Sequence, residues 1–265
     1  MSVAPEPHEI FARTREEGKR RLARTRLELA STALVAGFDV VFGVIALGVI
    51  AAALTPKTGS EIGHLVGSLG FGIAFVFIVV GRSELFTENF LVPMAGLQRS
   101  GSSKRKLAEL WIASPVLNIL GGIALILIVT SHGALPPGTA KSLLHIANDF
   151  HDRSVASLFL SAIAGGALIT LMTWLIEGVG SVGGRIVAAW IAGSLLTLGS
   201  FNHVIVVTLE LVFGIRYGAH YDWLYVAQNF AVAAAGNMIG GLLFVTLTRT
   251  GQAAGSGESS GPSEG

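Results

Sequence analysis

The chain lacks cysteine altogether and has few charged residues, and both absences narrow its class. Without cysteine, a disulfide framework and a thiolate metal site are excluded. Only 13% of the 265 residues are charged, whereas 51% are hydrophobic and 34 are glycine. This composition is too apolar for a soluble domain, and the glycine content is typical of closely packed membrane helices. The sequence therefore predicts an integral membrane protein.

Several other signals are missing as well. The first 28 residues are charged and have no apolar core, so we do not expect a cleaved signal peptide. The sequence has no phosphate-binding glycine loop, nucleophile elbow or catalytic dyad, and its histidines lack the close spacing of metal ligands. We therefore expect neither an enzyme nor an ATP-driven pump, and no cofactor, metal site or nucleic-acid partner.

Long apolar segments predict the transmembrane helices. A spanning helix needs about 20 mostly apolar residues, and six segments meet this criterion: 29–54, 62–98, 107–130, 154–176, 184–214 and 222–248. We predict an all-α membrane protein with these six spans in residues 29–248. Residues 1–28 are predicted to form an amphipathic helix, either in contact with membrane lipids or solvated beside them. Residues 249–265 are predicted to be a flexible, low-complexity tail.

The distribution of lysine and arginine predicts the orientation of the spans. Thirteen of these residues lie on the side that holds both termini, and four lie on the opposite side. Because basic flanking segments stay in the cytoplasm, we expect both termini to be cytoplasmic.

Two of the apolar segments are interrupted by short polar stretches. The second span contains residues 84–89, and the fifth contains residues 199–203, which include Asn202 and His203. Both spans are longer than one crossing requires, so each is predicted to be two half-helices joined by a non-helical loop. Such backbone is tolerated in a membrane only where it is buried in protein or lines a cavity. Paired breaks of this kind predict a substrate path, and hence a channel or transporter.

The two halves of the chain resemble each other. The third span contains the sequence Asn118-Ile119-Leu120-Gly121-Gly122, which recurs in the sixth as Asn237-Met238-Ile239-Gly240-Gly241. Three spans in each half would insert the halves with opposite orientation, which predicts an inverted 3+3 repeat with a site near the bilayer midplane. The amides of Asn118 and Asn237 are predicted to brace the loop ends by hydrogen bonds.

Four of these motifs together resemble the formate/nitrite transporter family. They are Glu84-Leu85-Phe86-Thr87 after a glycine-rich helix, Trp111 with Asn118 and Gly121, Phe201-x-His203, and Asn229 followed by Gly236-Asn237-x-x-Gly240-Gly241. The resemblance implies an aquaporin-like protomer, assembled as a homopentamer in the inner membrane of a bacterium, with one pore per protomer. It also implies transport of small monovalent weak-acid anions such as formate, nitrite, lactate or hydrosulfide, often together with a proton.

The resemblance implies roles for individual side chains. Thr87 would be the pore threonine and His203 the central histidine, between hydrophobic constrictions formed by Phe71, Phe75, Phe86, Leu196 and Phe201. A histidine near the bilayer centre is costly unless it faces a polar cavity, and it can exchange a proton near neutral pH. An anion dehydrated between the constrictions would take up a proton and cross as the neutral acid. Alternatively, His203 is a buried histidine without a transport role, and Thr87 caps its loop.

Acidic residues are unusually frequent in the predicted membrane interior. They are Asp39, Glu84, Glu88 and Glu210, and they would repel an anion unless they are protonated or paired, for example with Arg82. Glu84 matches a family acid and is predicted to anchor its loop. Glu88, Asn202 and Glu210 are candidates for the pore, although Glu210 could instead tie its half-helix to a neighbour.

Departures from the family pattern leave other functions open. Asn202 stands where formate channels commonly have an acid, and Phe150 and Gly166 stand where a lysine and an asparagine are expected. With weaker attraction for anions, the chain could be a facilitator of small neutral solutes. It could also be a non-conducting member whose phenylalanines seal the path.

Overall fold

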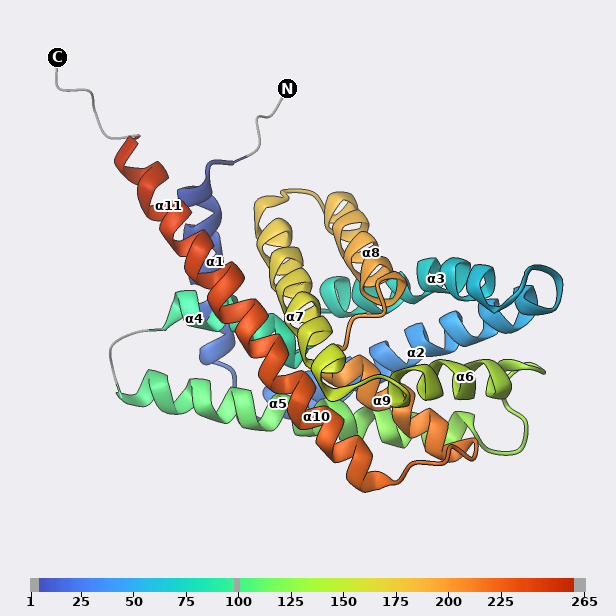
Figure 1. The fold of residues 1–265 in the computed structure, drawn as a ribbon. Helices are drawn as coiled ribbons and strands as arrows, with labels where there is room; N and C mark the ends of the chain where they lie inside the picture. The colour runs from blue at the N-terminus through green and yellow to red at the C-terminus, as the bar shows by residue number, and fades with distance from the viewer. Residues whose placement is uncertain (1–4, 98–100, 260–265) are drawn as a thin grey trace, which may run out of the picture.

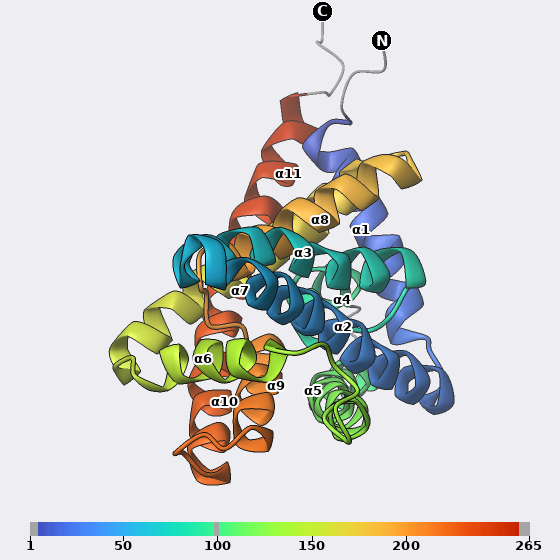
Figure 2. The same cartoon turned by 90° about the vertical axis from the view of Figure 1, so that its right-hand side faces the viewer.

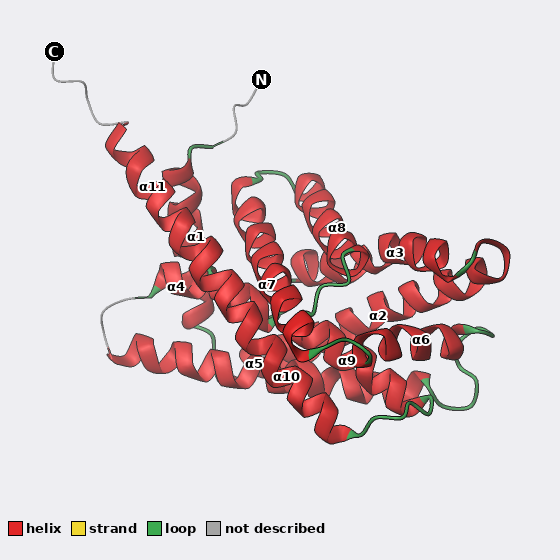
Figure 3. Ribbon diagram, viewed as in Figure 1, coloured by secondary structure: helices red, strands yellow, loops and turns green. Residues whose placement is uncertain are grey.

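The computed structural model describes residues 5–97 and 101–259. Residues 260–265 of the predicted tail, and Arg99 of the orientation argument, lie outside these described residues. All regular structure in the described part of the chain is helical (Figure 3), which confirms the predicted all-α class. In chain order the elements are α1 (Pro7–Leu22), α2 (Arg26–Thr58), α3 (Ser60–Gly81), η1 (Phe86–Phe90), α4 (Val92–Gly96), α5 (Gly101–Val129), α6 (Thr139–His151), α7 (Val155–Gly178), α8 (Val182–Leu198), α9 (Val204–Arg216), α10 (Trp223–Met238), η2 (Ile239–Thr246) and α11 (Leu247–Ser259).

Five helical stretches in the described residues are long and apolar enough to cross a membrane. They are α2, α3, α5, α7 and the continuous run of α10, η2 and α11. The fifth predicted span does not reach this length as one helix, because the break divides it into α8, with 17 residues, and α9, with 13. The two breaks are therefore unequal: α3 has 22 residues before its break, whereas only the short η1 and α4 follow it.

Some helices pack against their neighbours in the sequence, and other contacts join helices that are distant in the sequence. The α2–α3 pair lies beside α8, and α10 runs along α7 (Figures 1 and 2). α9 lies against α5, α6 and α10, so the loop before it is in the middle of the molecule. α1 packs on α4 and α11, which brings the two ends of the described chain to the same end of the molecule (Figure 1).

Close helix contacts occur at two glycines in matching places. A Cβ atom at Gly37 of α2 would lie 2.1 Å from the carbonyl oxygen of Asn118 in α5. A Cβ atom at Gly166 of α7 would lie 2.2 Å from the carbonyl oxygen of Asn237 in α10. Only glycine allows backbones to approach this closely, so Gly166, which stands where an asparagine was expected, has a packing role.

The structure differs from the sequence-based expectations at two places. Residues 139–151 form the amphipathic helix α6, which was not predicted, and α6 packs its apolar residues on α2 and α9. The predicted flexible tail is helical as far as Ser259. This helix continues without a stop from α10, and its Ala253 is buried beside Ile10 and Phe11 of α1. Packing on α1 supplies the burial that the polar composition of the tail did not suggest.

Candidate functional site

The first break is held by the side chain of Asn118 from α5. Its Oδ1 accepts a hydrogen bond from the backbone N–H of Phe86 at 3.0 Å. Its Nδ2 donates to the carbonyl oxygens of Ala33 at 2.8 Å and Glu84 at 2.9 Å. One buried amide thus satisfies two backbone groups of the loop that no helix provides for and ties the loop to a carbonyl oxygen of α2.

The second break is held in the same way by Asn237 from α10. Its Oδ1 accepts from the N–H of Val204 at 2.9 Å. Its Nδ2 donates to the carbonyl oxygens of Ala162 at 2.7 Å and Asn202 at 3.0 Å. Each asparagine therefore bonds one N–H and one C=O of its loop and one C=O of a neighbouring span.

The two breaks meet at Thr87 and His203. Oγ1 of Thr87 and Nε2 of His203 are 2.7 Å apart, and both side chains are fully buried. Nδ1 of His203 accepts a hydrogen bond from the N–H of Val206 at 3.3 Å and so caps α9. Because Nδ1 is an acceptor, a neutral imidazole carries its proton on Nε2 and donates it to Thr87. The hydroxyl proton of Thr87 is then not used in this bond.

Aromatic side chains lie next to this pair. The ring of Phe75 meets His203 edge-on with centroids 6.3 Å apart, and Phe71 follows at 6.1 Å from Phe75. Leu196 and Phe201 lie on another side, where they line a small cavity with residues of α3, α6 and α9. Phe86 contacts Phe90, with ring centroids 5.1 Å apart.

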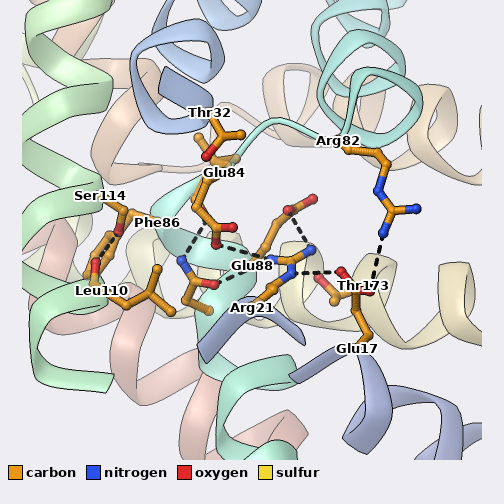
Figure 4. Close-up of polar contacts among 12 residues, drawn as sticks. Glu17, Arg21, Thr32, Arg82, Glu84, Phe86, Glu88, Leu110, Ser114 and Thr173 are labelled. Carbon is orange, nitrogen blue, oxygen red and sulfur yellow. Dashed lines mark hydrogen bonds and ion pairs between the residues drawn. The ribbon is translucent and has the colours of Figure 1, made fainter. Parts of the chain in front are cut away.

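The two glutamates of the first break pair with arginines of the N-terminal segment, and Figure 4 shows Glu84 and Glu88 around Arg21. Nη1 of Arg21 lies 3.3 Å from Oε1 of Glu84, and Nη2 of the same arginine lies 3.3 Å from Oε2 of Glu88. Arg24 forms a second ion pair with Glu84. Arg82, considered as a partner from the sequence, instead lies 3.3 Å from Glu17 of α1.

Of these charged residues all but Glu84 line a cavity of about 220 Å³ between α1 and the ends of α3 and α7. Burial opposes ionisation of Glu17, but the hydrogen bond from Arg20 and the charges of Arg21 and Arg82 outweigh it and lower the pKa of Glu17 to about 2. Burial, together with the positive charges of its neighbours, lowers the pKa of Arg24 to about 10. Both groups are therefore charged at neutral pH.

Asn202 and Glu210 differ in how their polar atoms are satisfied. Nδ2 of Asn202 donates to Oδ1 of Asn229 at 2.9 Å and Nδ2 of Asn229 donates back to Oδ1 of Asn202 at 3.3 Å. The carboxyl group of Glu210 is buried, and its Oε2 has no hydrogen-bond partner. Asp39 accepts a hydrogen bond from the hydroxyl of Ser83 at 2.6 Å.

Sequence reasoning missed Arg21, Arg24 and His64. The arginines are 60 or more residues from the glutamates that they contact, and their segment was expected to form a helix at the membrane surface. A charge count would have pointed to them, because two buried carboxylates need nearby cations and the first 28 residues are the richest source of lysine and arginine. His64 lies in a predicted span, and its Nε2 is 3.1 Å from the carbonyl oxygen of Thr197 in α8.

The chain is similar to proteins of known family. A family model described as Formate/nitrite transporter matches residues 8–250. The chain is 27% identical over 245 residues to the inner membrane protein YfdC of Escherichia coli (strain K12), covering 90% of this chain and 76% of YfdC. It is 22% identical over 240 residues to the formate channel BtFdhC of Bacillus thuringiensis, covering 90% and 92%.

Two solved structures share the fold. One, described as an FNT family ion channel, has a TM-score of 0.72 at 18% identity and covers 90% of this chain and 96% of the other. The second, described as a pentameric formate channel with formate bound, has a TM-score of 0.69 at 17% identity and covers 84% and 95%. At these identities the likeness establishes the fold alone.

Proposed function

Because the chain belongs to the formate/nitrite transporter family, whose members are channels and transporters and not enzymes, we propose that it is a channel for small monovalent weak-acid anions of the formate class, moved together with a proton. The observation that carries this proposal is the contact between Thr87 and His203, which joins the two breaks beside the rings of Phe71 and Phe75. A proton-bearing polar pair next to apolar rings is the arrangement that such transport needs.

The proposed architecture is an aquaporin-like protomer with six spans in an inverted 3+3 repeat. α8 and α9 together form the fifth span, and the matching hydrogen bonds of Asn118 and Asn237 support the repeat. We propose a homopentamer in the inner membrane of a bacterium, because one protein of the same fold is described as pentameric and one relative is an inner membrane protein. α1 and α11, at the two ends of the described chain, lie at one end of the molecule, which we assign to the cytoplasm.

Exposed apolar side chains of the spans provide the contacts with lipids and neighbouring subunits. Examples are Ile112 and Leu120 on α5 and Phe244 on η2, which are more than half exposed in the single chain. α1 lies on α4 and α11 through its buried Thr14, Gly18 and Leu22, so its contact with lipids is limited to the remaining surface.

The transport step follows from the chemistry of the central pair. A carboxylate that loses water beside Phe71 and Phe75 becomes a stronger base. It accepts one proton from the pair of His203 and Thr87, and water on the side from which the anion came returns that proton to the pair. The neutral acid then crosses the second constriction and releases its proton, so one proton moves with each anion.

The test is proton-linked flux in proteoliposomes. Gradients of formate, nitrite, lactate or hydrosulfide should acidify the lumen with the wild type, and His203→Asn should reduce the rate by about 100-fold, as expected for loss of a proton donor. Asn148→Ala, in α6, is the matched control and should transport as the wild type does. Wild-type rates from His203→Asn, with the protein folded, would contradict the proposal.

A facilitator for small neutral solutes is the alternative, and one observation favours it. Phe150 lines the outer side of the path where a lysine would attract anions. This alternative predicts vesicle swelling without a change in luminal pH. A non-conducting member, with the path sealed by phenylalanines, would show neither signal.

A further inference from the structure

Glu210 lies in α9, seven residues after His203, the residue that caps this helix. Almost two helical turns separate them, which places Glu210 about 10 Å further along the helix axis. Glu210 is 2% exposed, and its Oε2 atom has no hydrogen-bond partner. The proposed transport step does not use this carboxyl group.

The carboxyl group of Glu210 lines a cavity of about 10 Å³, which is room for about one water molecule. Phe150, Phe201 and Leu196 are among the other lining residues. Where the family resemblance leads one to expect a lysine, this cavity thus has Phe150 and a carboxyl group.

His64 and Ile146 lie between this cavity and a larger one. Both residues also line a cavity of about 320 Å³ at the ends of α2, α3 and α6, which contains Glu61, His145 and Asp149. The half-buried imidazole of His64 therefore stands between a polar outer cavity and the chamber of Glu210. An imidazole in this position can relay a proton between water and the chamber.

In the described part of the chain, the residues that line the cavity of Glu210 provide no positive partner; Arg153, which donates to the carbonyl oxygen of Ser200 at 2.7 Å and lies 5.2 Å from the ring centroid of Phe150, is a nearby cation but does not line the cavity. Among the described residues that line its cavity, His64 of α3 is the only other titratable one, and none is lysine or arginine. From α6, His145 and Asp149 line the outer cavity instead. α10 has no charged residue, and those of α5 lie at its start, from Lys104 to Glu109.

The nearby polar groups on the remaining sides are already engaged. Tyr221, after α9, donates its hydroxyl to the carbonyl oxygen of Leu211 at 2.9 Å. The charged residues of α2 are Arg26, Glu28, Asp39 and Lys57, and none of them lines the cavity. A buried carboxylate without a partner is costly, so the neutral acid is the stable form of Glu210.

We propose that Glu210 is a second proton-exchange group of the path, on the outer side of His203. The proposal rests on the function proposed above. In the step, the O–H bond of Glu210 breaks, the one water molecule that the chamber has room for passes the proton to a weak-acid anion on the path beside it, and a proton from water in the outer cavity, relayed by His64, restores the acid. The neutral carboxylic acid donates its hydrogen bond to that water molecule.

Infrared difference spectroscopy tests the proton directly, without the need for transport. The full-length protein at neutral pH should show a carbonyl band of a protonated carboxylic acid that shifts in D₂O. Glu210→Gln should remove this band, Glu210→Asp should move it, and the surface substitution Glu109→Gln should leave it unchanged. A spectrum that Glu210→Gln does not alter would overturn the inference.

Flux in proteoliposomes tests the role of that proton. Glu210→Gln should lower proton-linked flux about 10-fold and steepen its dependence on outer pH, whereas Glu210→Asp should restore most of it. Thermal unfolding of each variant separates a folding defect from loss of exchange. Wild-type flux from Glu210→Gln at every pH would refute the exchange role. If the wild type itself moves no weak acid, the proposed function fails, and the infrared band alone then decides whether Glu210 holds a proton.

Discussion

The first and second breaks have the same brace in surroundings of different charge. At the first, Asn118 bonds to Phe86 and Glu84 of the loop, and at the second, Asn237 bonds to Val204 and Asn202. In both, one amide completes the backbone hydrogen bonds of a loop that would otherwise be unpaired in the membrane. One side chain thus completes the hydrogen bonds of each loop backbone, so the residues next to it can differ between the two breaks.

The neighbouring positions do differ, because only the first break contains ionised pairs. Glu84 and Glu88 contact Arg21 and Arg24. The corresponding position at the second break is Asn202, whose partner is the neutral amide of Asn229. Charge is buried at the first break because α1 and the turn after it supply the cations, Arg21 and Arg24. The first break therefore depends on a segment beyond the membrane, whereas the second is complete within it.

The largest expected effect comes from removal of a cation at the first break. Arg24→Gln leaves one buried ion pair of Glu84 without its arginine, and we expect a loss of about 3–5 kcal/mol in the free energy of unfolding. Asn229→Ala, the equivalent change at the second break, removes a neutral partner and should cost about 1–3 kcal/mol. Chemical unfolding in detergent measures both.

The double variant Arg24→Gln with Glu84→Gln is the control for this prediction. It removes the charge that was left unpaired, so it should recover most of the lost stability. If Arg24→Gln lowers the free energy of unfolding no more than Asn229→Ala does, the difference in charge between the two breaks does not affect stability.

A second prediction tests what the breaks share. Asn118→Leu and Asn237→Leu each leave one N–H and one C=O group of the loop without partners and remove one bond to a neighbouring span, and each should cost about 3 kcal/mol. The yield of folded oligomer and the unfolding midpoint measure the effect, with Asn148→Leu in α6 as the control. A large difference between the two variants would show that the braces are not equivalent.

Much of this arrangement could be predicted from the sequence, because it depends on local patterns. The motif resemblance to the formate/nitrite transporter family is confirmed by the match over residues 8–250. The hydrogen bonds of Asn118 and Asn237 lie at the loop ends, where the repeated motif placed them. Polar residues that interrupt apolar runs are rare enough in membranes to be informative by themselves.

The remaining features depend on contacts that are distant in the sequence. The pairing of Arg21 and Arg24 with Glu84 joins residues about 60 positions apart, and no periodicity reports it. The continuation of α11 to Ser259 depends on its contact with α1, which polar composition does not reveal. The unequal lengths of α3 and α8 could not be predicted from the sequence either, since an apolar run does not show where its helix ends.

A third prediction concerns the close contacts behind each brace. Gly37→Ala and Gly166→Ala place a methyl group against the carbonyl oxygens of Asn118 and Asn237, and each should cost about 1–3 kcal/mol through forced separation of the helices. Gly183→Ala is the control, because a Cβ atom there meets nothing within 4 Å. Thermal unfolding should show similar losses of stability for Gly37→Ala and Gly166→Ala, and a much smaller loss for Gly183→Ala.

The smallest effect should distinguish the breaks by pH. Burial works against ionisation of Glu17, but its arginine neighbours lower its pKa from 4.5 to about 2. A lowered pKa in the folded state means that this stabilisation is complete above pH 4.5 and is lost as the pH falls toward 2. We expect about 1 kcal/mol, since the partners Arg20 and Arg82 are partly exposed to solvent. Glu17→Gln should lack this contribution at pH 7 and depend less on pH below 4.5. Hydrogen exchange should show this loss of stability at residues 82–91 and not at residues 199–206, because α1 touches only the first break. Equal changes in both loops would mean that the two breaks are coupled through more than the bond between Thr87 and His203.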